Sequence, residues 1–274
     1  MMGWYDKKYT RFEICRAASF HVTALKVESK YTYRGIRVHT TKDVDHYLMY
    51  FGPDVTTWYV SGFTFNWKKF IDEHKLPINA SSHANYKKWY RNIYRESYGS
   101  YILKKELVFD IDRKEGVPFE TVGNAAARLV DVLMDSGFRG VSAIFSGQGG
   151  YHVVVDNMEP YIKQFGLELA ARTPKAFAYV AIEMAKKVLD TAFSKNFEDR
   201  GGDGRTYERF KVDYSPMFPS GIRKMPYTIT SSGTVVFPVE RRELDRIDDI
   251  EYFMPDNLLS KYKIAGRGIP KLYS

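Results

Sequence analysis

Two carboxylates end the apolar run Glu106-Leu107-Val108-Phe109-Asp110-Ile111-Asp112, at the spacing i, i+2. In a β-strand, residues at this spacing point to the same face, and their Cα atoms lie roughly 7 Å apart. Two such carboxylates can converge on one or two divalent cations, as in the two-metal sites of phosphoryl and nucleotidyl transfer, which are about 3.5–4 Å across. Taken alone, the pair is explained equally well by a strand that ends in turn-forming aspartates.

A glycine-rich turn follows after one predicted helix and one predicted strand, within the segment SAIFSGQGGYHVVV at 142–155. The β-rich runs on both sides of the turn predict a hairpin. Glycines let the backbone approach an anion, and successive N–H groups in such a turn can hold a phosphate. Ser146 adds a hydroxyl donor and His152 adds an imidazole. An ordinary hairpin with a half-buried histidine is the alternative, but the two motifs together are more specific than either one.

The two motifs, in this order, resemble those of the catalytic small subunit of the archaeal-eukaryotic primases, in the prim-pol superfamily. In that family a third carboxylate ends a later strand, and Asp213 matches it at the end of Phe210-Lys211-Val212-Asp213. The segment 221–239 matches the region that follows this carboxylate in the family. Segments near the N-terminus match more weakly, so the resemblance spans roughly Tyr9 to Val239.

The resemblance implies a mixed α/β (α+β) architecture, namely a prim-pol fold with an RRM-like sheet and flanking helices. We expect one prim-pol catalytic domain over residues 1–245, with an N-terminal α/β part at about 1–100 and a catalytic core at about 101–245. Residues 246–274 are expected to form a basic C-terminal tail.

The resemblance also implies a DNA-dependent primase or polymerase that synthesises short RNA or DNA primers on a single-stranded DNA template from NTPs or dNTPs. Asp110, Asp112 and Asp213 would be the catalytic residues and would hold two Mg²⁺ or Mn²⁺ ions. A large primase subunit or a replicative helicase would be a further partner. The nucleotide phosphates would be bound by Ser146, Gly147, Gln148, Gly149, His152, Arg223 and Lys224.

The chain departs from the family at several basic positions. Family members often carry Arg in the glycine-rich turn and a His and a Lys in the later segment, where this chain has Gln148, Gly149, Thr230 and Ser231. Positive charge for the triphosphate must then come from elsewhere, and Arg223 and Lys224 are the nearest candidates. These differences also suggest a plasmid or viral branch of the superfamily.

The composition agrees with a nucleic-acid partner. The net charge of +8 and the pI near 9.2 suit a polyanion, although the same charge also serves general solubility. A single cysteine, Cys15, allows no internal disulfide and no thiolate-based structural zinc site. No apolar run approaches the ~20 residues of a membrane span, and no signal-peptide pattern opens the chain. We therefore expect a cytoplasmic, nucleoid-associated protein, or a nuclear one if the source is eukaryotic.

The remaining pattern predicts helices and one long loop. Apolar residues at helical spacing predict helices over about 122–133, ended by Gly137, and over about 174–194. A polar, aromatic and basic stretch at 79–98 predicts another helix. Residues 198–205 are interpreted as a flexible surface loop that could face template or primer through its arginines.

Two other functions remain open at this point. One is the polymerase domain that accompanies bacterial end-joining ligases, which has a similar carboxylate pair and glycine turn and which fills or extends ends. The other is a prim-pol-like subunit that binds nucleic acid without chemistry, which three intact aspartates argue against. Nucleotide incorporation with and without a primer would separate the three.

Overall fold

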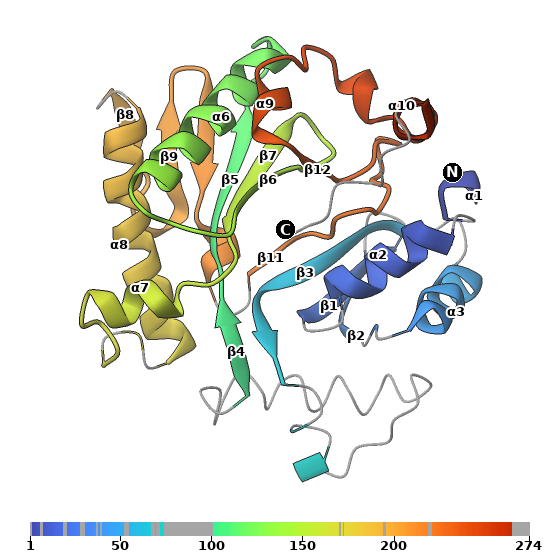
Figure 1. The fold of residues 1–274 in the computed structure, drawn as a ribbon, viewed down its shortest axis with the longest axis horizontal. Coiled ribbons are helices and arrows are strands. Elements are labelled where there is room, and N and C mark those ends of the chain that lie inside the picture. The colour runs from blue at the N-terminus through green and yellow to red at the C-terminus, as the bar shows by residue number, and fades with distance from the viewer. Residues whose placement is uncertain are drawn as a thin grey trace.

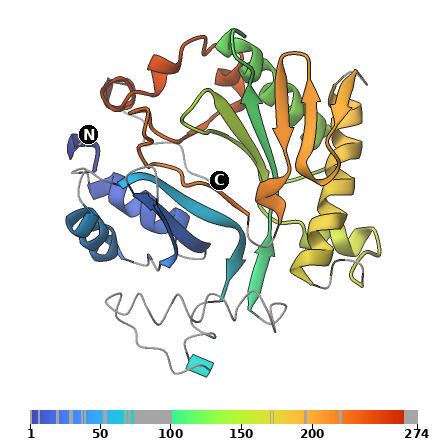
Figure 2. The same ribbon diagram turned by 180° about the vertical axis from the view of Figure 1, so that it is seen from behind.

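Two antiparallel sheets lie beside each other, each with helices packed against it (Figures 1 and 2). They are joined by one extended stretch, because β4 (Ile102–Lys105) of the smaller sheet and β5 (Leu107–Arg113) of the larger sheet are separated only by Glu106. The computed structural model describes residues 2–5, 8–18, 21–27, 31–36, 38, 40–51, 55–66, 69, 72–73, 101–169, 171, 173–193, 196–218 and 221–264.

The smaller sheet comes mostly from the N-terminal part of the chain. Within the described residues its strand order is β11-β3-β1-β2, and β4 pairs with β3. Helix α2 contacts both α3 and β1. The remaining elements of this part are α1 (Met2–Tyr5), α2 (Lys8–Ala18), β1 (His21–Val27), β2 (Tyr31–Ile36), α3 (Thr41–Phe51), β3 (Val55–Phe65) and β11 (Ile222–Lys224).

The larger sheet has the strand order β12-β6-β7-β5-β10-β9-β8 within the described residues. Its further strands are β6 (Val141–Phe145), β7 (Gly150–Val155), β8 (Phe197–Asp199), β9 (Gly204–Tyr207), β10 (Phe210–Asp213) and β12 (Phe237–Val239). The helices of this part are α6 (Phe119–Asp135), α7 (Glu159–Gln164), α8 (Pro174–Ala192), α9 (Arg241–Leu244) and α10 (Pro255–Ile264), with short 3₁₀ turns η4 (Gly201–Asp203), η5 (Ser215–Met217) and η6 (Ile250–Phe253).

Four central strands of the larger sheet have the topology of an RRM. Along the chain the elements run β5-α6-β6-β7-α8-β10, while in space the strands run β10-β5-β7-β6. This is the split βαβ arrangement, in which a strand is inserted between the two strands of each crossover unit. The expected mixed α/β fold with an RRM-like sheet and flanking helices is therefore confirmed.

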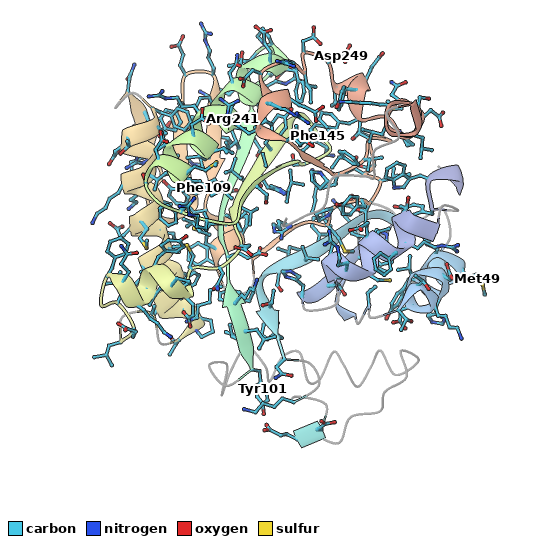
Figure 3. The ribbon with its side chains drawn as sticks, viewed as in Figure 1. Met49, Tyr101, Phe109, Phe145, Arg241 and Asp249 are labelled. Carbon is cyan, nitrogen blue, oxygen red and sulfur yellow. The ribbon has the colours of Figure 1, made fainter. Side chains whose placement is uncertain are left out.

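Strand β5 separates its apolar and acidic residues by alternation. Phe109 and Ile111 are completely buried on the face that α6 and α8 cover, and Asp110 and Asp112 point to the other face. Phe109 lies inside the body of the protein, whereas Met49 projects outward from α3 (Figure 3). The spacing of the aspartates therefore places both carboxylates on one face of the sheet, as the sequence predicts.

The two long helices begin and end close to the predicted residues. Helix α6 ends at Asp135, and Gly137 beyond it has a φ of 87°, which favours glycine. Helix α8 begins after Thr173, whose hydroxyl accepts a hydrogen bond from the Ala176 N–H at 3.2 Å. These positions follow from local chemistry and helical periodicity.

Two expectations about chain organisation need correction. The expected loop at 198–205 instead contains β8, η4 and β9, and Arg205 is buried with its guanidinium 2.7 Å from Asp190. The expected tail from residue 246 begins with packed structure, since Phe253 stacks on Phe145 at 3.7 Å between ring centroids and Leu258 is buried. The first difference arises from local strand pairing among β8, β9 and β10, and the second arises from packing against residues distant in sequence. The helix expected at 79–98 lies outside the described residues.

None of the helices in the described part of the chain is both long enough and apolar enough to span a lipid bilayer.

Candidate active site

Three aspartates lie on adjacent strands of the larger sheet. Asp213 on β10 pairs in register with Asp110 on β5, and His152 on β7 pairs with Asp110 from the other side. The neighbouring row runs from Gly150 through Asp112 to Lys211. Side chains of paired residues lie on the same face of an antiparallel sheet. The register thus brings together the three carboxylates that the sequence singled out.

Asp110 is strained electrostatically. Its pKa is raised to about 8, first by burial and then by the nearby charges of Asp112 and Asp213. Its Oδ1 atom is buried and has no hydrogen-bond partner, although His152 Nε2 lies 3.4 Å away in poor alignment for a hydrogen bond. A buried carboxylate oxygen without a donor, next to two further carboxylates, is a position where a cation would be strongly stabilised.

The other two carboxylates already have partners. Lys211 Nζ lies 3.1 Å from Asp112 Oδ2, and the Ser215 N–H donates to Asp213 Oδ1 at 2.6 Å. Among the residues that the structure describes, no three side chains of His, Cys, Asp or Glu are grouped closely enough to hold a metal ion as they stand. Asp112 and Asp213 would have to change their side-chain conformations for all three to share a cation.

The donor set nevertheless fits a hard divalent cation. Mg²⁺ and Mn²⁺ prefer carboxylate oxygens, and all three candidate ligands are aspartates. A cation beside Asp110 would also favour its ionised form and so offset the burial and repulsion that raise its pKa. The sole cysteine, Cys15, is buried elsewhere, and burial raises the pKa of its thiol to about 12.

Lys224, on β11 of the smaller sheet, lies close enough to Asp110 and Asp112 for their charges to act on its pKa. Burial lowers its pKa, and Lys26 lowers it too, while the charges of Asp110 and Asp112 act in the opposite direction. Lys224 Nζ donates to Gln148 Oε1 at 2.8 Å, and Gln148 Nε2 donates to Ser231 Oγ at 3.3 Å. The amide of Gln148 therefore holds the ammonium group beside the carboxylates.

His152 is buried and neutral. Burial lowers its pKa well below the ordinary value, and the positive charges of Arg223 and Lys224 lower it further. The imidazole is therefore neutral at neutral pH, and its buried Nδ1 is left without a hydrogen-bond partner.

The glycine turn, residues 146–150, borders this acidic face. A Cβ at Gly150 would clash with the carbonyl oxygen of Ile111 and would come within 3.1 Å of Asp112 Oδ1 and 3.2 Å of Ser146 Oγ. Only glycine fits there, so the Ser146 hydroxyl and the Asp112 carboxylate flank the same bare backbone. Gly147 and Gly149 have φ values of 85° and 93°, which other residues rarely adopt.

Arg223 is placed differently from its neighbour. Its guanidinium donates to both carboxylate oxygens of Glu106 at 3.1 Å, and only 2 % of the residue is exposed. His21 Nε2 lies 3.8 Å from the same carboxylate. Contact between Arg223 and a phosphate would require leaving this buried pair, so the structure favours Lys224 of the two expected cations.

The comparisons with known proteins show the family of this chain. A family model described as the primase-polymerase domain of LigD matches residues 88–267. This chain belongs to that family. The resemblance to prim-pol proteins is therefore confirmed at the level of the superfamily, while the small-subunit type of archaeal-eukaryotic primases is not what the family model describes.

The fold of this primase-polymerase domain is similar to a solved structure. The polymerase domain of Ligase D from Mycobacterium tuberculosis, in complex with DNA, superposes with a TM-score of 0.58 at 16 % sequence identity. The match covers 97 % of this chain and 88 % of that chain. A search among curated proteins finds no match.

Three charged residues of the domain were missed by sequence reasoning. Lys211 contacts Asp112. The guanidinium of Arg113 packs against Gly149, where an added Cβ would lie 3.4 Å from it. Glu106, the partner of Arg223, was quoted only as the start of the apolar run. Its charge at the start of a buried strand was the one signal that could have predicted a buried partner.

Proposed function

We propose that this primase-polymerase domain adds nucleotides to the 3′ end of DNA in a template-directed, metal-dependent reaction, and that it extends or fills existing ends. The observation that carries the proposal is the register of Asp110, Asp112 and Asp213, with an orphaned carboxylate oxygen on Asp110. Membership in the LigD primase-polymerase family favours end extension over the synthesis of new primers.

The three aspartates would hold two Mg²⁺ or Mn²⁺ ions. Bound there, such ions lower the pKa of the attacking 3′-hydroxyl and neutralise charge on the triphosphate and the departing pyrophosphate. Asp110 supplies the most buried oxygen and Asp213 lies directly opposite it, so these two side chains fix the centre of the site. Asp112 lies two residues further along β5, beside Gly150 of the glycine turn.

The other residues of the site would bind the incoming nucleotide. Ser146 and the backbone of the glycine turn, including Gly147, Gln148 and Gly149, offer hydrogen-bond donors to phosphate oxygens. His152 would donate from its neutral ring, and Lys224 would supply positive charge from the smaller sheet. The reaction needs these donors where negative charge develops, and a fixed donor there contributes most in the transition state.

DNA would be the macromolecular partner. The similar Ligase D domain was solved in complex with DNA, and the net charge of +8 favours binding to phosphates. The template strand must present unpaired bases next to the 3′ end, so a recessed end or a short gap is the substrate with the required geometry.

Incorporation of a labelled nucleotide tests the proposal. The protein is incubated with Mn²⁺ or Mg²⁺ and either a primed, recessed DNA end or the same template without primer, using NTPs and dNTPs in parallel. We expect incorporation on the recessed end only. Efficient synthesis without a primer would instead establish primase activity, and metal-dependent binding of DNA without incorporation would establish a binding subunit.

Variants of the other two carboxylates link that activity to the site. Asp112→Asn and Asp213→Asn keep the side-chain shape and remove one charge each, and both should reduce incorporation at least about a hundredfold. Glu198→Gln, on the exposed edge strand β8 of the same sheet, is the matched control and should retain full activity. Full activity in either aspartate variant would contradict the metal assignment.

A further inference from the structure

Three hydroxyl groups converge on one backbone carbonyl of the glycine turn. The Gly147 oxygen accepts hydrogen bonds from Thr230 Oγ1 at 3.1 Å, Ser232 Oγ at 2.6 Å and Thr234 Oγ1 at 2.6 Å. A carbonyl oxygen has two lone pairs and ordinarily accepts one or two bonds. The two short bonds, from Ser232 and Thr234, are enough to hold this carbonyl in one direction, and Thr230 lies beside them. These three residues are called the hydroxyl cluster below.

The hydroxyl cluster is itself fixed in place. Its oxygens lie 2.7–3.1 Å from one another, and because each hydroxyl has a single proton, one that donates to Gly147 can only accept from its neighbours. The backbone around it forms a tight turn in which the Thr230 N–H donates to the Thr234 carbonyl at 2.9 Å and Ile229 pairs with Val235. Thr230 and Thr234 are buried. The cluster is thus a rigid support that packs against the glycine turn.

Close packing ties the two segments together as well. A Cβ at Gly147 would clash with the methyl group of Thr230, so the turn can lie against the cluster only with glycine at this position. A second contact comes from Gln148, whose side chain joins Ser231 to Lys224. The Gly147 carbonyl and the Gln148 side chain therefore both bind the turn to the same later segment, residues 224–234.

The direction of the carbonyl determines what the turn presents to a ligand. Every peptide bond in the described chain is trans, and in a trans peptide the C=O and N–H groups point in opposite directions. With the Gly147 oxygen turned into the hydroxyl cluster, the Gln148 N–H points away from the cluster. The same contact removes a negative pole from the surface that the turn offers to an anion.

We propose that the hydroxyl cluster of Thr230, Ser232 and Thr234 is a positioning device for the triphosphate of the incoming nucleotide, acting through the Gly147 carbonyl. This inference rests on the proposed function and deepens it. It assigns a task to the segment where the chain lacks the expected basic residues. The hydroxyls hold the turn in an anion-binding conformation, and Lys224, held by Gln148, supplies the charge.

The test removes the two shortest bonds. In the double variant Ser232→Ala/Thr234→Val, valine keeps the shape of threonine without its hydroxyl. We expect the nucleotide KM to rise about tenfold, equivalent to about 1.4 kcal/mol, while kcat changes less than twofold and the affinity for the DNA end is unchanged. The single variant Thr234→Ser keeps the hydroxyl, and its nucleotide KM should stay within about twofold of the wild type.

Thr228→Val is the matched control. Thr228 is buried in the same segment, but its hydroxyl donates to the Met225 carbonyl and not to the turn. Its KM should equal that of the wild type even if its melting temperature falls. If the double variant shows an unchanged KM, or if Thr228→Val raises KM as much, the hydroxyl cluster only stabilises the fold and the inference is overturned.

Direct binding of a fluorescent nucleoside triphosphate with Mn²⁺ separates this inference from the proposed function. A protein that incorporates no nucleotide, yet binds it about tenfold more tightly than the double variant does, would refute polymerase activity and support the positioning role. A wild-type protein that binds no nucleoside triphosphate would overturn the positioning role itself.

Discussion

Glu106 and Asp110 are four residues apart on one extended stretch, and both carboxylates are largely withdrawn from water. They differ in the charges and hydrogen-bond donors that surround them. Glu106 accepts hydrogen bonds from Nε and Nη2 of the Arg223 guanidinium, and its backbone N–H donates to the Gly62 carbonyl at 2.9 Å. Asp110, with 23 % of its side chain exposed, faces two other carboxylates and has an oxygen without a donor.

The difference separates a charge that the fold pairs from a charge that it leaves unpaired. Glu106 lies where the chain passes from the smaller sheet to the larger, and its pair with Arg223 joins the two sheets at that crossing. Asp110 lies four residues further along the chain, where its buried Oδ1 has no donor and either a proton or a bound cation would offset its charge. A charge that the fold satisfies holds structure together, whereas a charge that the fold leaves unsatisfied is available for binding and catalysis.

The largest effect that would sharpen this comparison is expected at Asp110. Asp110→Asn should lower nucleotide incorporation by about a thousandfold, because the central metal ligand contributes several kcal/mol to the transition state. The fold should remain intact, since the variant removes one of three like charges. Incorporation within tenfold of the wild type would mean that Asp110 is not a central ligand.

In metal-free buffer, the stability of the wild-type protein should depend on pH in a way that the Asp110→Asn variant does not. An unfolded aspartate has a pKa of about 3.9, whereas that of Asp110 is raised to about 8 in the folded protein. Between these values the unfolded chain releases this proton first, so the free energy of unfolding should fall as pH rises from about 4 to about 8. Chemical denaturation should show this fall relative to Asp110→Asn, which lacks the group. Identical pH profiles would contradict the raised pKa.

A smaller effect, on stability instead of activity, is expected at Glu106. Glu106→Gln leaves the guanidinium of Arg223 buried without its carboxylate, and breaking a buried pair in this way costs about 3–5 kcal/mol. Glu183→Gln is the control, because Glu183 is 67 % exposed in its pair with Lys186 and should cost less than about 1 kcal/mol. Equal losses in the two variants, measured by chemical denaturation, would remove the contrast between Glu106 and Asp110.

The smallest of these effects is expected at Lys224. Lys224→Met keeps the length of the side chain and removes its charge, and it should raise the nucleotide KM about tenfold, or about 1.4 kcal/mol, with little change in melting temperature. Lys175→Met, at an exposed position near the start of α8, is the control and should leave KM unchanged. An unchanged KM in Lys224→Met would place the triphosphate elsewhere.

Sequence reasoning succeeded where the signal was local. The i, i+2 spacing of Asp110 and Asp112, the hairpin around the glycine turn and the helices α6 and α8 all appear in the structure close to their expected residues. Each of these depends on the period of a strand or helix, or on a residue that starts or stops one. The third carboxylate, Asp213, was located by its resemblance to a family motif, and the register of β10 then placed it beside Asp110.

Sequence reasoning failed where a side chain's partner lies far away in the chain. Arg223 and Lys224 are neighbours and were assigned the same task, but alternation along β11 sends one to Glu106 and the other toward the aspartates. Arg205 was expected at the surface and is buried against Asp190. The hydroxyl cluster, 83 to 87 residues from the carbonyl that it holds, has no signature in the sequence at all.

The sequence by itself therefore determined on which face of the sheet Asp110 and Asp112 lie, because the period of a strand fixes the face of each side chain. Only the tertiary structure decided which charges are satisfied. Burial and pairing depend on the approach of the smaller sheet to the larger one, and that approach leaves Asp110 without a donor while Glu106 receives two.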